Sequence, residues 1–182
     1  MKKLRELKEL LKPETDLESR ITSDPDFLEG AYYGRPRRGH PEGEVLYHIR
    51  EVLDNVDKYS TPENRSTLRI IALIHDTFKN KVDQNKPKVG ENHHAMIARR
   101  FAEKFHIEAD VLDVIELHDE AYNAWSMGHR RNDWKGAEKR INVLIQRLND
   151  CNFSLFETFY KCDNETGDKS QDNFIWFQSQ FV

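Results

Sequence analysis

Histidine and aspartate residues, whose side chains ligate metals, lie at the ends of several apolar segments of this chain. There are eight histidines in 182 residues, and His75 followed by Asp76 closes the most apolar segment, LRIIALIHD. An imidazole beside a carboxylate at the end of a buried helix is unfavourable unless both have a partner. A divalent cation is the simplest partner, because this ligand mixture suits Zn, Mn, Fe, Co or Ni better than Mg.

Four further residues of these types lie near predicted helix ends or have apolar neighbours three and four positions away: His48, His94, His118 and Asp163. Four converging helices can direct such groups into one pocket. Each residue alone also has a simpler explanation. His48 could be a half-buried helix histidine. His118 followed by Asp119 could be a helix end favoured by the dipole, and Asp163 could be a cap.

The elements that must position these residues are helices. Apolar periodicity predicts an all-α fold of roughly seven to nine helices. The predicted helices are 2–12, a helix from Glu44, a helix from near Pro62 to Asp76, and helices at about 92–106, 108–122, 137–149, 152–162 and 171–182. The predicted loops are 13–43, 80–89, 126–136 and 163–170. No alternating strand pattern and no internal repeat is present.

Composition limits the class of protein. The length suits one domain with a real core. A net charge of −4 argues against binding to bulk DNA and leaves a small phosphorylated substrate or a locally held RNA end. Cys151 and Cys162 are too far apart for a CxxC metal pair. No signal peptide or membrane-spanning run is evident, which predicts a cytoplasmic protein with reduced thiols and no membrane partner.

The order of these motifs resembles the HD superfamily of metal-dependent phosphohydrolases, which is named for its adjacent His-Asp pair. ALIHDTFK resembles the His-Asp-x-x-Lys signature, with Lys79 as the lysine. HAMIARRFAEKF, IELHDE and FYKCDNETGDK resemble the later motifs, and HPEGEVLYH resembles the entry to the HD module of bacterial CCA-adding tRNA nucleotidyltransferases. The resemblance covers about residues 41–169. It implies a single, compact HD phosphohydrolase domain over 1–182, with an N-terminal helix and loop (1–40) and a C-terminal helix (171–182).

The resemblance also implies a set of metal ligands, which are His48, His75, Asp76, His94, His118 and Asp163. A first ion would be held by His48, His75, Asp76 and Asp163. With a second ion, Asp76 bridges and His94 and His118 join it. Lys79 would contact an equatorial phosphate oxygen. If one ion binds, His94 and His118 are free to contact phosphate or to move protons. The catalytic set is therefore Lys79, Asp76, His94 and His118, with one or two ions of Mn, Ni, Co, Fe or Zn.

Two positions depart from the family pattern or leave it open. His93 and His94 are both candidates for the third motif, and His94 is favoured because Ala95 and Ala98 then occupy the positions of small residues. Phe78 stands where the lysine motif usually has glycine. We expect this change to affect the shape of the pocket more than metal binding.

Two basic segments flank the motifs, and both are predicted to be loops. The first carries Arg35, Arg37 and Arg38, and the second carries His129, Arg130 and Arg131. Either could clamp a substrate phosphate, although solvated surface charge explains them equally well. Trp125 and Trp134 could stack on a base, but core or rim positions are commoner for such residues.

The expected function is hydrolysis of a phosphorylated small molecule, a nucleotide or an RNA end. Analogy to the CCA-adding module suggests 2′,3′-cyclic phosphate or 2′-phosphate chemistry, but a fold alone does not define a substrate. Two alternatives share the pattern. One is a mixed-valent di-iron oxygenase, because a few HD-fold proteins use the same six ligands to activate O₂. The other is a non-catalytic binding or regulatory module, against which the intact ligands argue. Substrate, native metal and oligomeric state are not indicated by the sequence.

Overall fold

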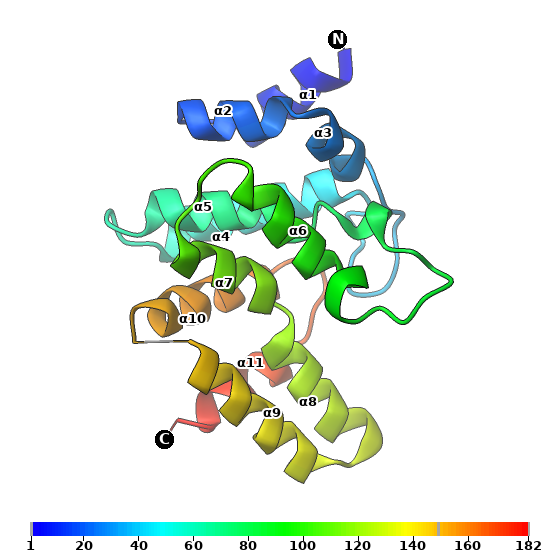
Figure 1. Cartoon of the computed structure of the whole chain (residues 1–182), viewed down its shortest axis with the longest axis vertical. Coiled ribbons are helices and arrows are strands. Elements are labelled where there is room, and N and C mark those ends of the chain that lie inside the picture. The colour runs from blue at the N-terminus through cyan, green and yellow to red at the C-terminus, as the bar shows by residue number, and fades with distance from the viewer. Residues whose placement is uncertain (1, 149, 182) are drawn as a thin grey trace.

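The computed structural model describes residues 2–148 and 150–181, and the side chains of Asp150 and Cys151 lie outside that description. The described residues form eleven α-helices and two short 3₁₀ helices (Figure 1). No β-strand occurs among them, and only two isolated bridges pair Gly34 with Glu44 and Arg37 with His40. The predicted all-α class is confirmed, whereas the predicted count of seven to nine helices is too low.

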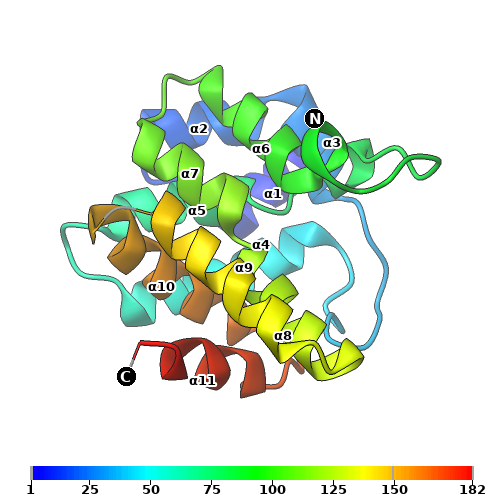
Figure 2. The same ribbon diagram turned by 60° about the horizontal axis from the view of Figure 1, so that its bottom comes forward.

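The helices fall into three spatial groups along the long axis of the molecule (Figure 1). At one end lie α1 (Lys2–Leu11), α2 (Asp16–Ser23) and α3 (Pro25–Ala31). The middle contains α4 (Val45–Tyr59), α5 (Arg65–Ile74), α6 (His94–Glu103), α7 (Ala109–Leu117) and α10 (Asp150–Asn164), with the 3₁₀ helices η1 (Lys79–Lys81) and η2 (Gly90–Asn92). The other end holds α8 (Glu120–Arg131), α9 (Trp134–Arg147) and α11 (Asp172–Ser179), which lie together in Figure 2.

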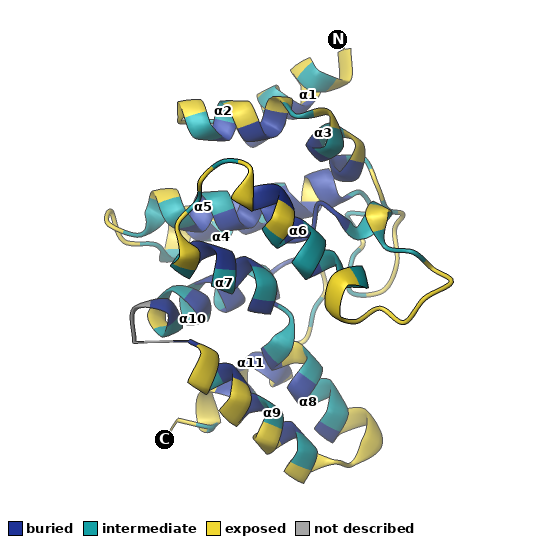
Figure 3. Cartoon of the chain, in the orientation of Figure 1, coloured by how far each residue is buried: buried dark blue, intermediate teal, exposed yellow. Residues whose placement is uncertain are grey.

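The middle group forms the core because its helices have wide apolar faces. Helix α5 is apolar nearly all round, and its residues from Leu68 to Ile74 are buried except for Ile70. It packs against α4, α7 and α10. Helix α4 buries seven residues of its fifteen, and it also packs against α10. Figure 3 shows buried stretches in dark blue on α6 and α7 of this group. A helix that is buried on nearly all sides, as α5 is, shields the residues at its end from water.

The predicted loop at residues 13–43 contains two short helices, α2 and α3. Thr15 caps α2, and its hydroxyl accepts a hydrogen bond from the Glu18 amide at 3.1 Å. Asp24 caps α3, with Pro25 in its first turn. These are ordinary helix-start signals, which the high proline and glycine content of the segment obscured.

The second correction concerns residues 108–136. The predicted helix at 108–122 is two helices, with α7 ending at Leu117 and α8 beginning at Glu120. The predicted loop at 126–136 is mostly the end of α8, which continues to Arg131. Positive charge is favourable in the last turn of a helix, and Asn132 ends α8 in the left-handed conformation (φ 54°). The break at 118–119 matters because it places His118 and Asp119 between two helices.

The N-terminal helices lie close to the middle group. A Cβ built on Gly30 would lie 1.9 Å from the Thr77 carbonyl oxygen, so no larger residue fits there. Thr77 directly follows the His75–Asp76 pair, and this contact therefore helps to hold that turn in place. Among the described helices, none has the length and apolar character needed to span a bilayer. Cys162 is free and buried.

Candidate metal centre

Helix ends bring the predicted residues together. His48 lies in the first turn of α4, and His75 ends α5 with Asp76 directly after it. His94 begins α6, His118 ends α7, and Asp163 lies in the last turn of α10. These are the residues named from the sequence, and five helices contribute them to one centre: His48, His75, Asp76, His94, His118 and Asp163. Helix ends suit this role because side chains there can face one another across a junction.

The first group consists of His48, His75 and Asp163, with one ligand atom from each within 4.8 Å of the others. The His48 Nε2 atom lies 3.2 Å from His75 Nε2 and 3.1 Å from Asp163 Oδ1. His75 Nε2 lies 3.9 Å from the same carboxylate oxygen. Both imidazoles are buried, and Asp163 is more exposed. The group therefore has a buried imidazole side and a carboxylate side closer to solvent.

The second group consists of Asp76, His94 and His118. The Asp76 Oδ1 atom lies 3.2 Å from His94 Nε2 and 3.4 Å from His118 Nε2. The two imidazole nitrogens are 3.3 Å apart. His93 does not face Asp76 in the same way, because its Nδ1 accepts a hydrogen bond from the Ala95 amide as the cap of α6. The geometry thus places His94 in the centre and His93 at its edge.

Asp76 joins the two groups. Its Oδ1 faces His94 and His118, while its Oδ2 lies 3.6 Å from His48 Nε2 and 3.8 Å from His75 Nε2. Oδ1 is buried and accepts no hydrogen bond within the described residues. A buried carboxylate oxygen without a partner is costly, and a cation removes that cost. The donor set of imidazole nitrogens and carboxylate oxygens fits a divalent transition metal on either side of Asp76.

Backbone contacts orient two of the imidazoles. His75 Nδ1 donates to the Ala72 carbonyl at 2.9 Å, and His118 Nδ1 donates to the Ile115 carbonyl at 2.8 Å. Each contact places the proton on Nδ1 and directs Nε2 toward the centre. A hydrogen bond of this kind is typical of metal-ligating histidine, since it sets both the tautomer and the ring orientation.

The protonation states follow from burial and from the neighbouring charges. Burial lowers the pKa of His75 to about 3, despite the attraction of the Asp76 and Asp163 carboxylates, so its Nε2 keeps a lone pair at neutral pH. Burial also opposes the charged form of His118, but Asp119 and Asp76 raise the pKa of its imidazole to about 9. Burial disfavours the ionised form of Asp76, yet Lys79 and His75 hold its pKa well below the usual range.

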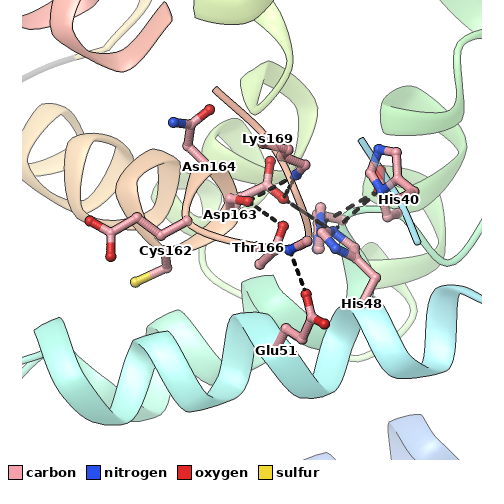
Figure 4. A network of polar contacts seen from close by, with 12 residues as sticks. His40, His48, Glu51, Cys162, Asp163, Asn164, Thr166 and Lys169 are labelled. Atoms are coloured by element: carbon pink, nitrogen blue, oxygen red, sulfur yellow. Dashed lines mark hydrogen bonds and ion pairs between the residues drawn. The ribbon is translucent and has the colours of Figure 1, made fainter. Parts of the chain in front are cut away.

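Two lysine ammonium groups contact the carboxylates of the centre. Lys79 Nζ contacts Asp76 Oδ2, the oxygen that faces the first group. Lys169 Nζ lies 3.0 Å from Asp163 Oδ1 and donates to the Asp163 carbonyl oxygen at 2.9 Å. Figure 4 shows Lys169 and His48 both directed at Asp163. Each ion pair keeps its carboxylate ionised and therefore able to act as a ligand.

Sequence reasoning did not select three residues at this centre: Asp119, Glu42 and Lys169. Asp119 Oδ2 lies 3.2 Å from His94 Nε2. Glu42 Oε1 lies 2.8 Å from His40 Nδ1 and 3.6 Å from His48 Nδ1. Asp119 adjoins His118, so a second His-Asp pair was a usable signal. Glu42 lies in HPEGEVLYH and Lys169 lies in FYKCDNETGDK, but neither motif indicates a contact with the ligands, because only folding brings these two residues to them.

The basic and aromatic residues that flank the motifs differ in how they are packed. Arg35, Arg37 and Arg38 are exposed in the segment between α3 and α4. Trp134 is exposed, and part of its ring packs against the chain. Its ring covers Gly128, where an added Cβ would lie 2.2 Å from it, and it also contacts Trp176.

The remaining flanking aromatics differ in their exposure and contacts. Trp125 is half-buried and stacks on His129, with ring centroids 4.5 Å apart. Phe78 is buried against Phe101 in the core. Packing in the core thus accommodates the bulk of Phe78, and the effect of Phe78 on the shape of the pocket stays a prediction.

Comparison with known proteins adds one finding. The family model described as the HD domain matches residues 43–150, more than half of the chain. The matched segment contains every predicted ligand except Asp163, which α10 brings back to the others. No curated protein and no solved structure matches the chain. HD domains in general are metal-dependent phosphohydrolases, and on this match the chain belongs to the HD domain family.

Proposed function

We propose that this chain is a metal-dependent phosphoester hydrolase that acts on a nucleotide or an RNA-terminal phosphate. The observation that carries the proposal is the position of Asp76. Its two carboxylate oxygens face two separate groups of imidazoles, with Oδ2 toward His48 and Oδ1 toward His94. A carboxylate placed in this way suits two cations side by side, an arrangement that stabilises both the attacking and the leaving oxygens of a phosphoryl displacement.

The proposed ligands divide at Asp76. His48, His75 and Asp163 would complete the first site, and His94 and His118 would complete the second. A bound divalent cation would polarise a phosphoryl oxygen and lower the pKa of water. The contacts from His75 to Ala72 and from His118 to Ile115 hold the ligand nitrogens toward the centre in advance. Such preorganisation lowers the cost of charge development during the reaction.

Lys79 is the proposed phosphate contact. Its side chain is 26% exposed, whereas that of Asp76 beside it is 7% exposed, so the lysine is the more open of the two to solvent. It forms its ion pair with the same Asp76 oxygen that would ligate the first cation. An ammonium group so near to the ligands can neutralise charge that develops on a phosphate oxygen.

The proposed substrate class rests on the surroundings. Helix α8 begins directly after Asp119 and carries Tyr122, Trp125 and His129, whose rings follow one another along the helix. Arg130 donates to the Tyr122 hydroxyl at 3.1 Å. Aromatic rings with a nearby guanidinium suit a nucleobase. An RNA end, and a 2′,3′-cyclic phosphate in particular, is suggested only by the likeness of HPEGEVLYH to the CCA-adding module.

The test is a phosphoester screen on purified protein, with added Mn, Ni, Co or Fe and with elemental analysis in parallel. Substrates are p-nitrophenyl phosphate, nucleoside monophosphates and 2′,3′-cyclic nucleotides. We expect turnover by the wild type and none by Asp76→Asn. The matched control is His106→Asn, since His106 is an exposed histidine in the left-handed conformation (φ 55°), which asparagine tolerates. Absence of turnover with every metal would refute the proposal.

A second candidate function uses the same centre. Four imidazoles and two carboxylates, one of which is the central Asp76, would also suit two iron ions that activate O₂. The two lysine ammonium groups at the carboxylates favour an anion over a neutral polyol, and the match to the HD domain favours a phosphohydrolase, which is why hydrolysis is the primary proposal. Iron content and O₂ consumption with polyol or phosphonate substrates distinguish the two functions.

A further inference from the structure

We propose that Lys169 is a second phosphate-binding residue and that Lys169 and Lys79 together select a phosphomonoester dianion over a phosphodiester. The inference rests on the proposed hydrolase function and defines its substrate class. Lys169 lies outside the segment that matches the HD domain, which ends at residue 150.

The two lysines take equivalent positions at the first group of ligands. Lys79 Nζ contacts Asp76 Oδ2, and Lys169 Nζ lies 3.0 Å from Asp163 Oδ1. Both carboxylate oxygens also face His48 Nε2, at 3.6 and 3.1 Å. Each ammonium group therefore adjoins one of the two carboxylate oxygens that face His48 Nε2. A phosphate bound beside these ligand atoms would lie within reach of both.

Burial shows which side of this group a substrate can enter. The side chains of His48 and His75 are 3% and 0% exposed, whereas those of Lys79 and Lys169 are 26% and 19% exposed. The imidazoles therefore form the closed side, and the two lysine side chains are more open to solvent. We expect an incoming anion to approach the ligands from the side of the lysines.

Lys169 is held in place by contacts that do not depend on the Asp163 carboxylate. Its Nζ also donates to the Asp163 carbonyl oxygen at 2.9 Å. The preceding residues are tied to the rest of the chain, because the Gly167 amide donates to Glu51 Oε2 at 2.8 Å and the Gly39 amide donates to Asp168 Oδ1 at 2.7 Å. Figure 4 shows Thr166, Glu51 and Lys169 around Asp163.

This anchoring leaves a donor for the substrate. An ammonium group has three N–H donors, and Lys169 uses two of them on Asp163. If a cation takes Asp163 Oδ1, the carbonyl contact still holds the ammonium group and frees a further donor. A preorganised donor of this kind binds anions without a large ordering cost.

Charge balance indicates a dianion. Glu42, Asp76, Asp119 and Asp163 supply four carboxylates and the two lysines supply two ammonium groups, so two divalent cations leave two net positive charges at the centre. A phosphomonoester is a dianion near pH 7, with a second pKa of about 6, whereas a diester carries one charge and lacks one of the unesterified oxygens. Two lysines therefore match the monoester.

The test compares Lys169→Met, Lys169→Arg and the exposed-lysine control Lys139→Met in Mn-loaded protein. Loss of one charge-assisted hydrogen bond should lower kcat/KM for p-nitrophenyl phosphate by about tenfold or more. For bis-p-nitrophenyl phosphate the decrease should be under about threefold, since the diester does not need the second lysine. Lys169→Arg should recover part of the loss, because it keeps the charge, and Lys139→Met should match the wild type. An equal decrease for both esters, together with lower Mn content, would show that Lys169 only supports the fold.

A binding measurement separates this inference from the proposed function. Calorimetry with inorganic phosphate on the Mn-loaded wild type and Lys169→Met needs no turnover. If the wild type hydrolyses neither ester but binds phosphate at least tenfold more tightly than Lys169→Met, the phosphate site stands and the hydrolase proposal fails. If the wild type turns over p-nitrophenyl phosphate and Lys169→Met binds phosphate equally well, the hydrolase proposal stands and the role of Lys169 is refuted.

Discussion

Two buried charged clusters in this chain differ in whether their polar groups have partners. The cluster around Arg69 is complete. Its guanidinium donates to both carboxylate oxygens of Glu18, at 3.0 and 2.9 Å, and to the Lys12 carbonyl oxygen at 3.1 Å. Arg69 and Glu18 are 2% and 1% exposed. The cluster around Asp76 is incomplete, because Asp76 Oδ1 and His48 Nδ1 are buried without a hydrogen bond among the described residues.

The difference indicates what each cluster does. A buried ion pair whose donors and acceptors are all used supports one particular packing of its helices, and here Arg69 joins α5 to α2 and to the end of α1. A buried cluster with unused ligand atoms is stable only if something else completes it. The first cluster should therefore respond to mutation through folding stability, and the second through ion binding and activity.

The largest expected effect is on activity. Asp76→Asn keeps the shape of the side chain but removes the charge shared by both ligand groups. We expect kcat/KM to fall at least about a thousandfold, as when one member of a cooperating catalytic set is lost, with almost no bound metal. The free energy of unfolding without metal should change less than it does in Arg69→Met. A metal-loaded, active Asp76→Asn protein would contradict the assignment of Asp76 as the bridge.

Arg69→Met tests the complete cluster. Removing one partner leaves the Glu18 carboxylate buried and unpaired, which should lower the free energy of unfolding by about 3–5 kcal/mol. The double variant Arg69→Met, Glu18→Leu should recover much of that loss, since neither charge remains. Urea unfolding followed by circular dichroism measures both. Specific activity per folded molecule should stay near the wild-type value, and a specific loss of metal would show that the two clusters are not independent.

Divalent cations should stabilise the folded protein, and they should do so only through the incomplete cluster around Asp76. At a free Mn concentration of 100 times Kd, binding to the native state adds about 2.7 kcal/mol to the free energy of unfolding. We expect this gain in the wild type and in Arg69→Met, and none in Asp76→Asn. Thermal unfolding with a series of Mn concentrations measures it. An equal gain in Asp76→Asn would place the ion elsewhere.

The smallest expected effect is the pH dependence of ion binding at the second group. Because the carboxylates beside it raise the pKa of His118 to about 9, its imidazole is protonated at pH 7 and must lose that proton to act as a ligand. Metal affinity should therefore rise by about tenfold per pH unit from 7 to 9 and then level off. Calorimetry with Mn in buffers of different ionisation enthalpy measures the proton release. An affinity that is flat over this range would remove His118 from the ligand set.

Most of the helices could be predicted from the sequence, because the spacing of apolar residues is a local property. The start of α4 and both ends of α5 and α10 lie within a few residues of their predicted positions. The errors at α2, α3 and α8 came from weighing proline, glycine and charge above the capping residues Thr15 and Asp24 and above the favourable placement of Arg131 at a helix end. Those errors changed the helix count but not the fold class.

The sequence by itself determined the types of side chain available and the helix ends on which they lie, since both depend on neighbours within a few positions. It could not decide between His93 and His94, or show that Asp119 and Lys169 adjoin the same centre. Those choices depend on contacts such as Lys169 with Asp163 and on the return of α10 to α4, α5 and α7. Only the packing of helices that are far apart in the sequence sets such distances, and the local sequence pattern does not specify them.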